Sequence, residues 1–241
     1  MNLKLLRVRF DMILNKLANL FGVNAKMLDE EILIKTIKAN QIDLILDVGA
    51  NTGQFSELVL KLGYEGSILS FEPLSAAYEL LLRKSQKFKK WKVFDKCAIG
   101  DIDGTISINV SQNLLSSSAL KILEHHTSVS PESNVVAIEA VPIYKLDSIS
   151  AQYEEQYNNI LLKIDTQGYE EKVLIGSANF LSSVKGVLVE VSLTPLYEGQ
   201  KLFDDIYEML KTRGFNLWGI FPAFVNRANG RMLQVDLLLF K

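Results

Sequence analysis

Three carboxylates each follow a run of apolar residues, which is where α/β proteins most often place their chemistry. Asp47 ends the run 42–46 and precedes the turn GANTG, whose glycines are Gly49 and Gly53. Glu72 ends the next apolar run along the chain, and Asp165 ends a later one. In open parallel sheets, ligands bind beyond the carboxyl ends of the strands. We therefore expect these three carboxylates to share one ligand crevice.

The turn and Glu72 together indicate which ligand this is. The turn matches neither the dinucleotide pattern G-x-G-x-x-G nor the phosphate-binding pattern G-x-x-x-x-G-K-[ST]. A carboxylate such as Glu72 can accept hydrogen bonds from both hydroxyls of a ribose, and Asp47 could face an ammonium group. A nucleoside joined to an amino acid meets both demands, so we predict S-adenosylmethionine as the cofactor. The alternative is that Gly49 and Gly53 only permit a tight turn between a strand and a helix.

Asp165 and Glu190 are the candidates for acid–base chemistry. Each lies in a predicted buried strand or at its end, where an unpaired acid is costly unless it belongs to a site. Either could remove a proton from a hydroxyl or orient it. Together they could also hold a divalent cation such as magnesium, although the sequence indicates no third ligand. Lys163 is expected on the same strand face as Asp165, where it orients the acceptor or forms a structural ion pair.

Two further groups of residues are candidates for the site. His125 and His126 are the only histidines, and one of them could act as the base, although exposed loop histidines are commoner. Cys97 lies in a predicted strand and is expected simply to pack. Four aromatic residues form either an acceptor platform or part of the core: Tyr197, Trp218, Phe221 and Phe224.

Strand and helix patterns alternate from residue 41 onward, which predicts a mostly parallel sheet covered by helices on both faces. The predicted strands are 42–49, 66–73, 90–100, 104–110, 138–141, 158–168, 184–192, 215–221 and 232–240. The predicted helices are 54–63, 74–88, 169–181 and 201–214. Two consecutive strands close the chain, so the last is expected to run antiparallel. Residues 111–134 are polar and rich in serine, and we interpret them as a loop or lid within a single domain, 41–241.

Composition excludes several classes of protein. The 241 residues are 48% hydrophobic and 22% charged, with a formal net charge of -2. The lack of basic excess argues against nucleic acid as a partner. A single cysteine cannot form an intrachain disulfide, so a reducing, cytoplasmic location is expected. No apolar run is long enough to span a bilayer.

Residues 1–40 are expected to be an N-terminal helical extension. Within 1–21, apolar residues recur at helical spacing among scattered charges. We favour a helix that packs on the domain or on a second subunit, which would give a homodimer. The alternative is a helix that lies on a membrane surface.

In combination, the motifs resemble the FkbM family of methyltransferases. The matching stretches, in order, are DVGANTG, FEP, KIDTQGYE, VEVSLTPLYEGQ and QVDLLLF, and the resemblance covers about residues 42–241. It implies a class I, Rossmann-like three-layer fold with a seven-stranded, mostly parallel sheet whose last strand is antiparallel. It also implies S-adenosylmethionine as the methyl donor and O-methylation of sugars and natural-product hydroxyls.

The resemblance also carries roles onto residues. The methionine and ribose side would be lined by Asp47, Gly49, Ala50, Asn51 and Gly53. Glu72 would hold the ribose, and Ala98 or Asp101 would lie near the adenine. Asp165 would stand between the cofactor and the acceptor.

The expected function is therefore O-methylation of a sugar hydroxyl in a glycan or glycosylated metabolite. One alternative is a non-sugar acceptor, such as a polyketide, lipid or peptide. The other is a module that binds S-adenosylmethionine without catalysis. The carboxylates Asp165 and Glu190 speak against that last alternative, because a pure binder has no evident use for them.

Overall fold

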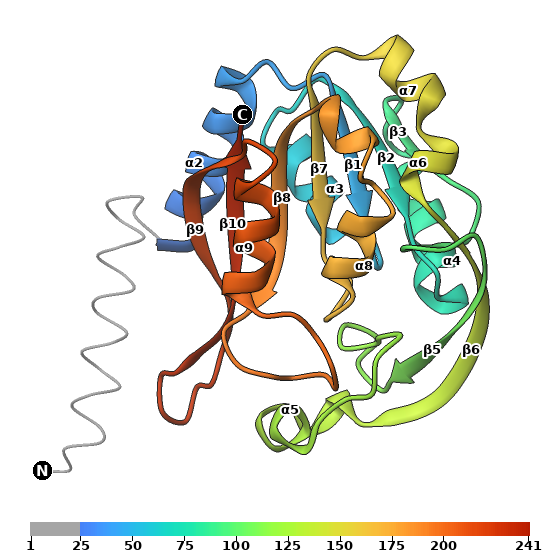
Figure 1. Ribbon diagram of the computed structural model, residues 1–241, viewed down its shortest axis with the longest axis vertical. Helices are drawn as coiled ribbons and strands as arrows, with labels where there is room; N and C mark the ends of the chain where they lie inside the picture. Colours follow the sequence, from blue (N-terminus) through green and yellow to red (C-terminus); the bar gives the residue numbers. More distant parts are fainter. Residues whose placement is uncertain (1–24) are drawn as a thin grey trace, which may run out of the picture.

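The computed structural model describes residues 25–241, which form a three-layer α/β domain around a seven-stranded sheet (Figure 1). In spatial order, the strands are β3 (Trp91–Val93), β2 (Ser67–Phe71), β1 (Leu44–Val48), β7 (Ile160–Ile164), β8 (Val184–Ser192), β10 (Met232–Phe240) and β9 (Asn216–Val225). The first five run parallel to one another, and β10 is antiparallel to both of its neighbours. The expected seven-stranded class I architecture with an antiparallel last strand is confirmed.

The central strands are buried along their whole length. Every residue of β1 (LILDV) and of β7 (ILLKI) is buried, because helices cover both faces of the sheet. This burial explains why both strands appear in the sequence as continuous apolar runs rather than as alternating ones.

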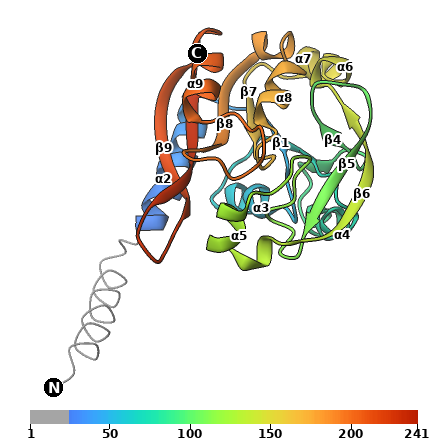
Figure 2. The ribbon, with the colours of Figure 1, turned by 60° about the horizontal axis from the view of Figure 1, so that its bottom comes forward.

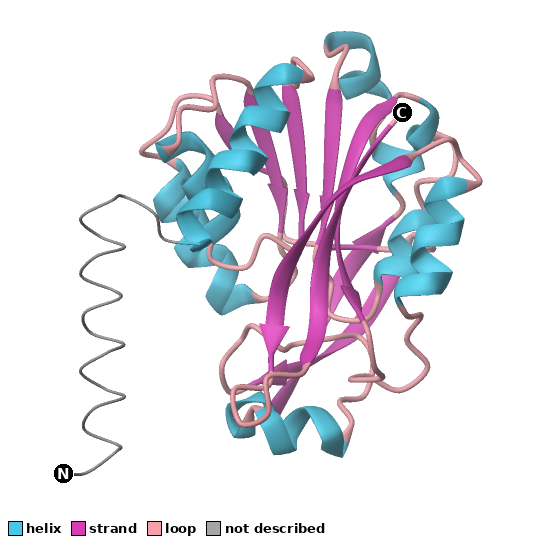
Figure 3. Ribbon diagram, turned by 90° about the vertical axis from the view of Figure 1, so that its left-hand side faces the viewer, coloured by secondary structure: helices cyan, strands magenta, loops and turns pink. Residues whose placement is uncertain are grey.

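Helices form one layer on each face of the sheet (Figure 3). On one face, α2 (Ala25–Ala39), α3 (Gln54–Lys61) and α4 (Ser75–Ser85) contribute Ile37, Val59 and Leu81 to a core that includes Ile45 of β1. On the other face lie α6 (Leu146–Ile149), α7 (Ala151–Gln156), α8 (Glu170–Ile175), the short 3-10 helix η2 (Phe180–Ser182) and α9 (Phe203–Lys211). The alternating side chains of β1 thus enter two separate cores.

The strand expected over 90–100 is instead two strands in two sheets, and this prediction was wrong. After β3, the chain leaves the main sheet and forms β4 (Ala98–Ile99) in a three-stranded sheet of order β4-β6-β5, with β5 at Gly104–Ser111 and β6 at Val135–Tyr144. The polar residues between the two strands explain the break. Lys96 leaves the strand line and pairs with Glu139 of β6 at 2.8 Å.

Residues 111–134, here called the lid segment, lie across the carboxyl ends of the main-sheet strands (Figures 1 and 2). The segment contains α5 (Glu124–Val129) and the 3-10 helix η1 (Pro131–Ser133). Backbone hydrogen bonds tie its flank to the loop after β8: Leu123 donates to the carbonyl of Leu196, and Glu198 donates to that of Lys121.

The helix predicted over residues 1–21 lies outside the described residues. Its packing on a second subunit or on a membrane therefore stays a prediction. Within residues 25–241, none of the helices is both long and apolar enough to cross a membrane.

Candidate active site

A pocket of about 710 Å³, open mouth included, lies at the carboxyl ends of β1, β2 and β7. Its polar lining includes Asn51, Glu72 and Asp165, and the small residues Gly49 and Ala98 also face it. Its other wall is largely apolar and includes Ile106, Ile108, Leu114, Leu115 and Ala119 from β5 and the lid segment. The pocket thus combines a carboxylate-bearing side with an apolar side, as a nucleoside requires.

Glycine is required at both ends of the turn after β1. Gly49 has φ +75°, and a Cβ built there would lie 1.8 Å from the carbonyl oxygen of Asp165. Gly53 has φ +80°, and its Cβ would lie 2.5 Å from the Trp91 ring. Both residues therefore combine a left-handed backbone with close packing. The turn is held tightly between the loop after β7 and the Trp91 ring. The alternative stated from the sequence, that the glycines only permit a tight turn, is therefore also consistent with the structure.

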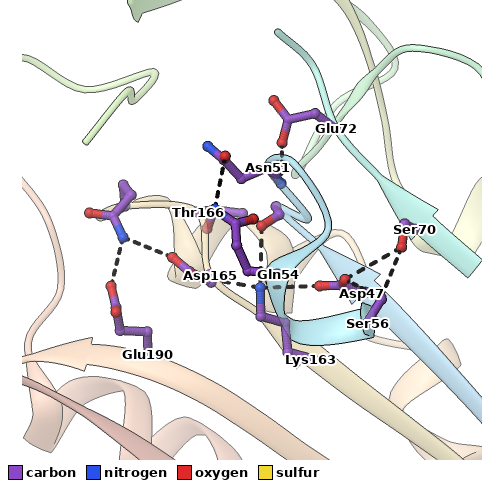
Figure 4. Close-up of polar contacts among 12 residues, drawn as sticks. Asp47, Asn51, Gln54, Ser56, Ser70, Glu72, Lys163, Asp165, Thr166 and Glu190 are labelled. Atoms are coloured by element: carbon purple, nitrogen blue, oxygen red, sulfur yellow. Dashed lines mark hydrogen bonds and ion pairs between the residues drawn. The ribbon is translucent and has the colours of Figure 1, made fainter. Parts of the chain in front are cut away.

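Asn51 connects this turn to both the acidic strand end and the lid segment, and Figure 4 shows its contact with Glu72. Its backbone N–H donates to Oε2 of Glu72 at 2.7 Å, and its side-chain amide donates to the carbonyl of Leu114 at 3.3 Å. Its Oδ1 accepts the N–H of Thr52 at 2.7 Å. Asn51 has φ +48°, a conformation that asparagine tolerates better than most residues. The turn is thereby fixed against Glu72 before any ligand binds.

Glu72 is buried at the end of β2 with only 4% of its surface exposed, yet it lines the pocket. Burial raises the pKa of its carboxyl group to about 7, although the donated N–H groups of Leu74 and Asn51 partly lower it. A carboxylate offers about four acceptor positions, and these two N–H groups occupy two of them. Two acceptor positions of Glu72 therefore remain without a backbone partner.

Asp47 lies beneath the turn and not on the pocket wall. Its side chain has no exposed surface. One carboxylate oxygen lies 3.1 Å from Nζ of Lys163, and the other accepts the hydroxyl of Ser56 at 2.7 Å. From the sequence, Asp47 is expected to face a cationic group of the ligand. In the structure, Lys163 neutralises Asp47 from below the turn, so direct contact between Asp47 and a ligand stays a prediction.

Lys163 is the cation at the centre of this network. Its Nζ donates to the carbonyl of Gly49 at 3.2 Å and lies 3.6 Å from Oδ2 of Asp165. Burial lowers the pKa of Lys163, but the carboxylates of Asp47 and Asp165 raise it more, so the net direction is upward. The ammonium group therefore stays charged and fixes the turn between two carboxylates. Of the two roles expected for Lys163, this arrangement favours a structural ion pair over orientation of the acceptor.

Asp165 and Glu190 are brought close together, and a side-chain amide joins them. Nε2 of Gln167 donates to Oδ1 of Asp165 at 2.8 Å and to Oε2 of Glu190 at 2.7 Å. Asp165 lines the pocket, whereas Glu190 lies to its side, partly buried, on β8. Burial raises the pKa of Glu190 well above its ordinary value, and the neighbouring Asp165 raises it further. Asp236, the β10 residue opposite Glu190, has its pKa raised to about 6 by burial.

The residues of this cluster do not form a metal site of ordinary composition. Within residues 25–241, no group of three or more His, Cys, Asp or Glu side chains is arranged to hold a metal ion. The amide nitrogen of Gln167 stands between Asp165 and Glu190, the two acids proposed as ligands. The magnesium site considered from the sequence is therefore not supported.

Of the two residues expected near the adenine, one lines the pocket. Ala98 lies on its wall, while Asp101 does not. The carboxylate of Asp101 instead pairs with Lys172 at 3.3 Å and accepts the Tyr169 hydroxyl at 3.5 Å. Cys97, expected only to pack, is buried and also contributes to the pocket wall.

The histidines lie away from the pocket lining. His125 is exposed, whereas His126 is buried, and burial lowers the pKa of the His126 imidazole to about 4. His126 packs edge-on against Tyr197 with ring centroids 5.2 Å apart, and its ring centroid lies 5.6 Å from that of Phe224. Trp218 is 59% exposed and packs on Phe240 instead of the pocket. None of the four aromatic candidates lines the pocket: Tyr197 is buried in the core, Phe221 and Phe224 pack against the core partly buried, and Trp218 is largely exposed.

Three polar residues of the site are not predicted from the sequence. Gln167 and Gln234 both donate to Glu190. Oε1 of Glu170 accepts three hydrogen bonds from Thr166 and Gly168, which hold the loop after β7. The only sequence signal for a role of Gln167 is its position beside Gly168 in KIDTQG. That position does not reveal the partners of Gln167, which lie far away in the sequence.

Comparison with known protein families assigns this chain to one of them. The sequence profile described as the Methyltransferase FkbM domain matches residues 47–217, more than half of the chain. The chain belongs to the FkbM methyltransferase family. FkbM proteins are S-adenosylmethionine-dependent methyltransferases. No curated protein matched the chain.

Solved structures are similar to this FkbM domain only at low sequence identity and with TM-scores below 0.5. The FkbM methyltransferase of Methylobacillus flagellatus KT is 13% identical over 81% of this chain and 43% of its own, with a TM-score of 0.49. TehB from Haemophilus influenzae is 12% identical over 91% of this chain and 62% of its own, with a TM-score of 0.46. Magnesium protoporphyrin IX methyltransferase from Synechocystis PCC 6803, solved with bound S-adenosylmethionine, is 10% identical over 89% of this chain and 79% of its own, with a TM-score of 0.47. This chain thus spans less than two thirds of the first two proteins, and none of the three informs its acceptor.

Proposed function

We propose that this FkbM protein is an O-methyltransferase that transfers the methyl group of S-adenosylmethionine to a hydroxyl of a sugar, in a glycan or a glycosylated metabolite. The observation that carries the proposal is that Glu72 and Asp165 line the same pocket from neighbouring parts of the sheet edge. One carboxylate would bind the ribose of a cofactor, and the other would face the acceptor hydroxyl.

The residues present fit an adenosine-containing cofactor. Glu72 and Asn51 would hold the ribose, because Glu72 keeps free acceptor positions after its two backbone contacts. Ala98 and the apolar side chains of β5 and the lid segment would enclose the adenine. When bound, S-adenosylmethionine supplies an electrophilic methyl group on a sulfonium.

The chain's own residues would then orient the acceptor and take its proton. A sugar hydroxyl is a weak nucleophile at neutral pH, so a positioned base accelerates its attack. Asp165 is our candidate for that base because it lines the pocket and keeps 34% of its side-chain surface exposed. Much of the remaining acceleration would come from alignment of the two reactants.

A sugar acceptor suits the polar character of the groups beside Asp165. Glu190, Gln167 and Gln234 form a hydrogen-bonded cluster of carboxylate and amide groups. Both amides donate to the same oxygen of Glu190, so its other oxygen can accept a hydrogen bond from a hydroxyl of a sugar ring, whereas a lipid or polyketide acceptor would leave that oxygen unpaired and desolvated.

The proposal is tested by measuring transfer of labelled methyl from S-adenosylmethionine to a panel of glycosides and to their matched aglycones, with and without a chelator. We expect transfer to glycosides alone, a loss of about 100-fold or more for Asp165→Asn, and no change for the exposed control Asp204→Asn. Transfer to aglycones alone would contradict the sugar assignment. Cofactor binding without transfer to any acceptor would instead support a binding module.

A further inference from the structure

Gln167 joins three separate parts of the molecule through its polar atoms. It lies in the loop between β7 and α8, in a left-handed conformation with φ +53°. Its side chain contacts Asp165 in the same loop, Glu190 on β8 and Tyr197 in the loop after β8. The sequence assigns it no function, and the chemistry described above does not use it.

The contacts fix the orientation of the Gln167 amide. Its nitrogen carries two hydrogens, and each of two carboxylates, Asp165 and Glu190, accepts one of them. Its oxygen accepts the hydroxyl of Tyr197 at 2.8 Å. A rotated amide would direct its oxygen at two carboxylates, so the observed orientation is the only one that satisfies all three partners. The amide thereby holds the two acids together without adding a charge.

The same residue is tied to the lid segment on two routes. The backbone carbonyl of Gln167 accepts the hydroxyl of Ser118 at 2.6 Å, and Ser118 also lines the pocket. The Tyr197 hydroxyl that donates to Gln167 also lies 3.1 Å from the carbonyl of Ser116. Displacement of the lid segment therefore breaks contacts to the residue that holds Asp165.

We propose that Gln167 is a positioning residue that couples closure of the lid segment over the cofactor pocket to placement of the Asp165 carboxylate. The proposal rests on the proposed function for the identity of the ligand, while the coupling itself is a property of the chain. With the lid segment closed, Tyr197 and Ser118 orient Gln167, and Gln167 orients Asp165. With the lid segment open, Asp165 loses this orientation. The Asp165 carboxylate is therefore positioned for reaction only when the lid segment covers the pocket.

Gln234 provides a matched control. Its Nε2 also donates to Oε2 of Glu190 at 2.7 Å, yet among the described hydrogen bonds it reaches neither Asp165 nor the lid segment. Gln167→Ala and Gln234→Ala therefore both remove one donor to Glu190, but only the first removes the link between the lid segment and Asp165. Tyr197→Phe cuts the same link from the other side while leaving Gln167 in place.

The test is hydrogen exchange of the full-length protein, read on peptides that cover 111–119, together with the dissociation rate of S-adenosylhomocysteine. For Gln167→Ala and Tyr197→Phe we expect exchange in 111–119 and ligand dissociation to be about fivefold faster or more, because local opening becomes easier. Gln234→Ala should match the wild type in both. A purely structural role would accelerate exchange throughout the domain instead.

Exchange in 111–119 that is unchanged in both link variants, or raised equally in Gln234→Ala, would overturn the coupling. If Gln167→Ala does not fold, Tyr197→Phe alone decides the question. The exchange measurement needs no ligand. A wild-type protein that fails to bind S-adenosylhomocysteine would therefore count against the proposed function, while the exchange result would still decide the coupling.

Discussion

Nζ of Lys163 lies 3.1 Å from Oδ1 of Asp47, and the two residues are register partners on adjacent strands β7 and β1. The pair sits directly below the turn that borders the pocket, and Lys163 also donates to the carbonyl of Gly49 in that turn. The floor of the site is thus an ion pair that bridges two strands, and it places the turn without contacting the pocket.

Asp47→Ala should strongly destabilise the fold. The substitution leaves Lys163 buried without its principal partner, which costs about 3–5 kcal/mol for a broken buried pair. Urea unfolding measures this loss. The control Glu57→Ala removes a partly exposed partner of Lys61 and Lys84, and it should cost much less, because solvent screens an exposed ion pair. Equal losses for the two variants would show that the buried pair does not support the site.

Gly49→Ala tests the close approach between the turn and the loop after β7. The new methyl group would overlap the carbonyl oxygen of Asp165, 1.8 Å away. Gly230→Ala is the matched control, because Gly230 has nearly the same φ, +76°, but a Cβ added there would meet no atom within 4 Å. We expect Gly230→Ala to cost about 1–2 kcal/mol from backbone strain alone, and Gly49→Ala to cost clearly more in urea unfolding. Similar costs would mean that the turn can move away freely.

Glu170→Gln should stabilise the protein at high pH. Burial raises the pKa of Glu170 to about 7 in the folded state, above the ordinary value of 4.5 that applies when unfolded. The folded state therefore binds the Glu170 proton more tightly than the unfolded state does. The contribution of this proton to the free energy of unfolding is complete below about pH 4.5 and is lost as the pH rises through about 7. The Glu170→Gln substitution removes this loss of unfolding free energy, which amounts to at most about 3 kcal/mol.

Unfolding free energies of wild type and Glu170→Gln, measured between pH 5 and 8, check this sign. The difference should shift in favour of the variant as the pH rises. Glutamine can keep the oxygen that accepts the bonds from Thr166 and Gly168, so the fold should be retained. Parallel pH profiles would contradict the raised pKa.

Cofactor affinity should depend on the ionisation of Glu72. Its pKa is raised to about 7 by burial, and ribose hydroxyls donate to the ionised form. Ligand binding must therefore drive off a proton below about pH 7, and the affinity for S-adenosylhomocysteine should rise from pH 6 to pH 8. Glu72→Gln should bind more weakly and lose most of this dependence. A wild-type affinity that is flat over this range would count against a direct role for the carboxylate.

The sequence predicts well what depends on local pattern. The apolar runs of β1 and β7 and the acids at their ends are visible because burial on both faces leaves no alternation. The turn glycines are visible for a similar local reason. The break between β3 and β4 is less visible, because it depends on Lys96 reaching Glu139 on a strand far along the chain.

Side-chain partners across the sheet could not be predicted. The sequence alone assigns Asp47 to the ligand, because its nearest cation, Lys163, lies on a strand distant in sequence but adjacent in register. Gln167 escapes prediction for the same reason, since its partners Glu190 and Tyr197 come together only through the order of the strands and the path of the loops.

The most direct test of the cofactor assignment is calorimetric titration of S-adenosylhomocysteine into the wild type and into Glu72→Ala, with Asp204→Asn as a surface control. We predict micromolar binding by the wild type and by the control. We predict a loss of about tenfold or more in Glu72→Ala, because charge-assisted hydrogen bonds to the ribose disappear. Thermal unfolding would verify that each variant is folded. No binding by the folded wild type, or equal affinity in folded Glu72→Ala, would contradict the assignment of this pocket to the cofactor.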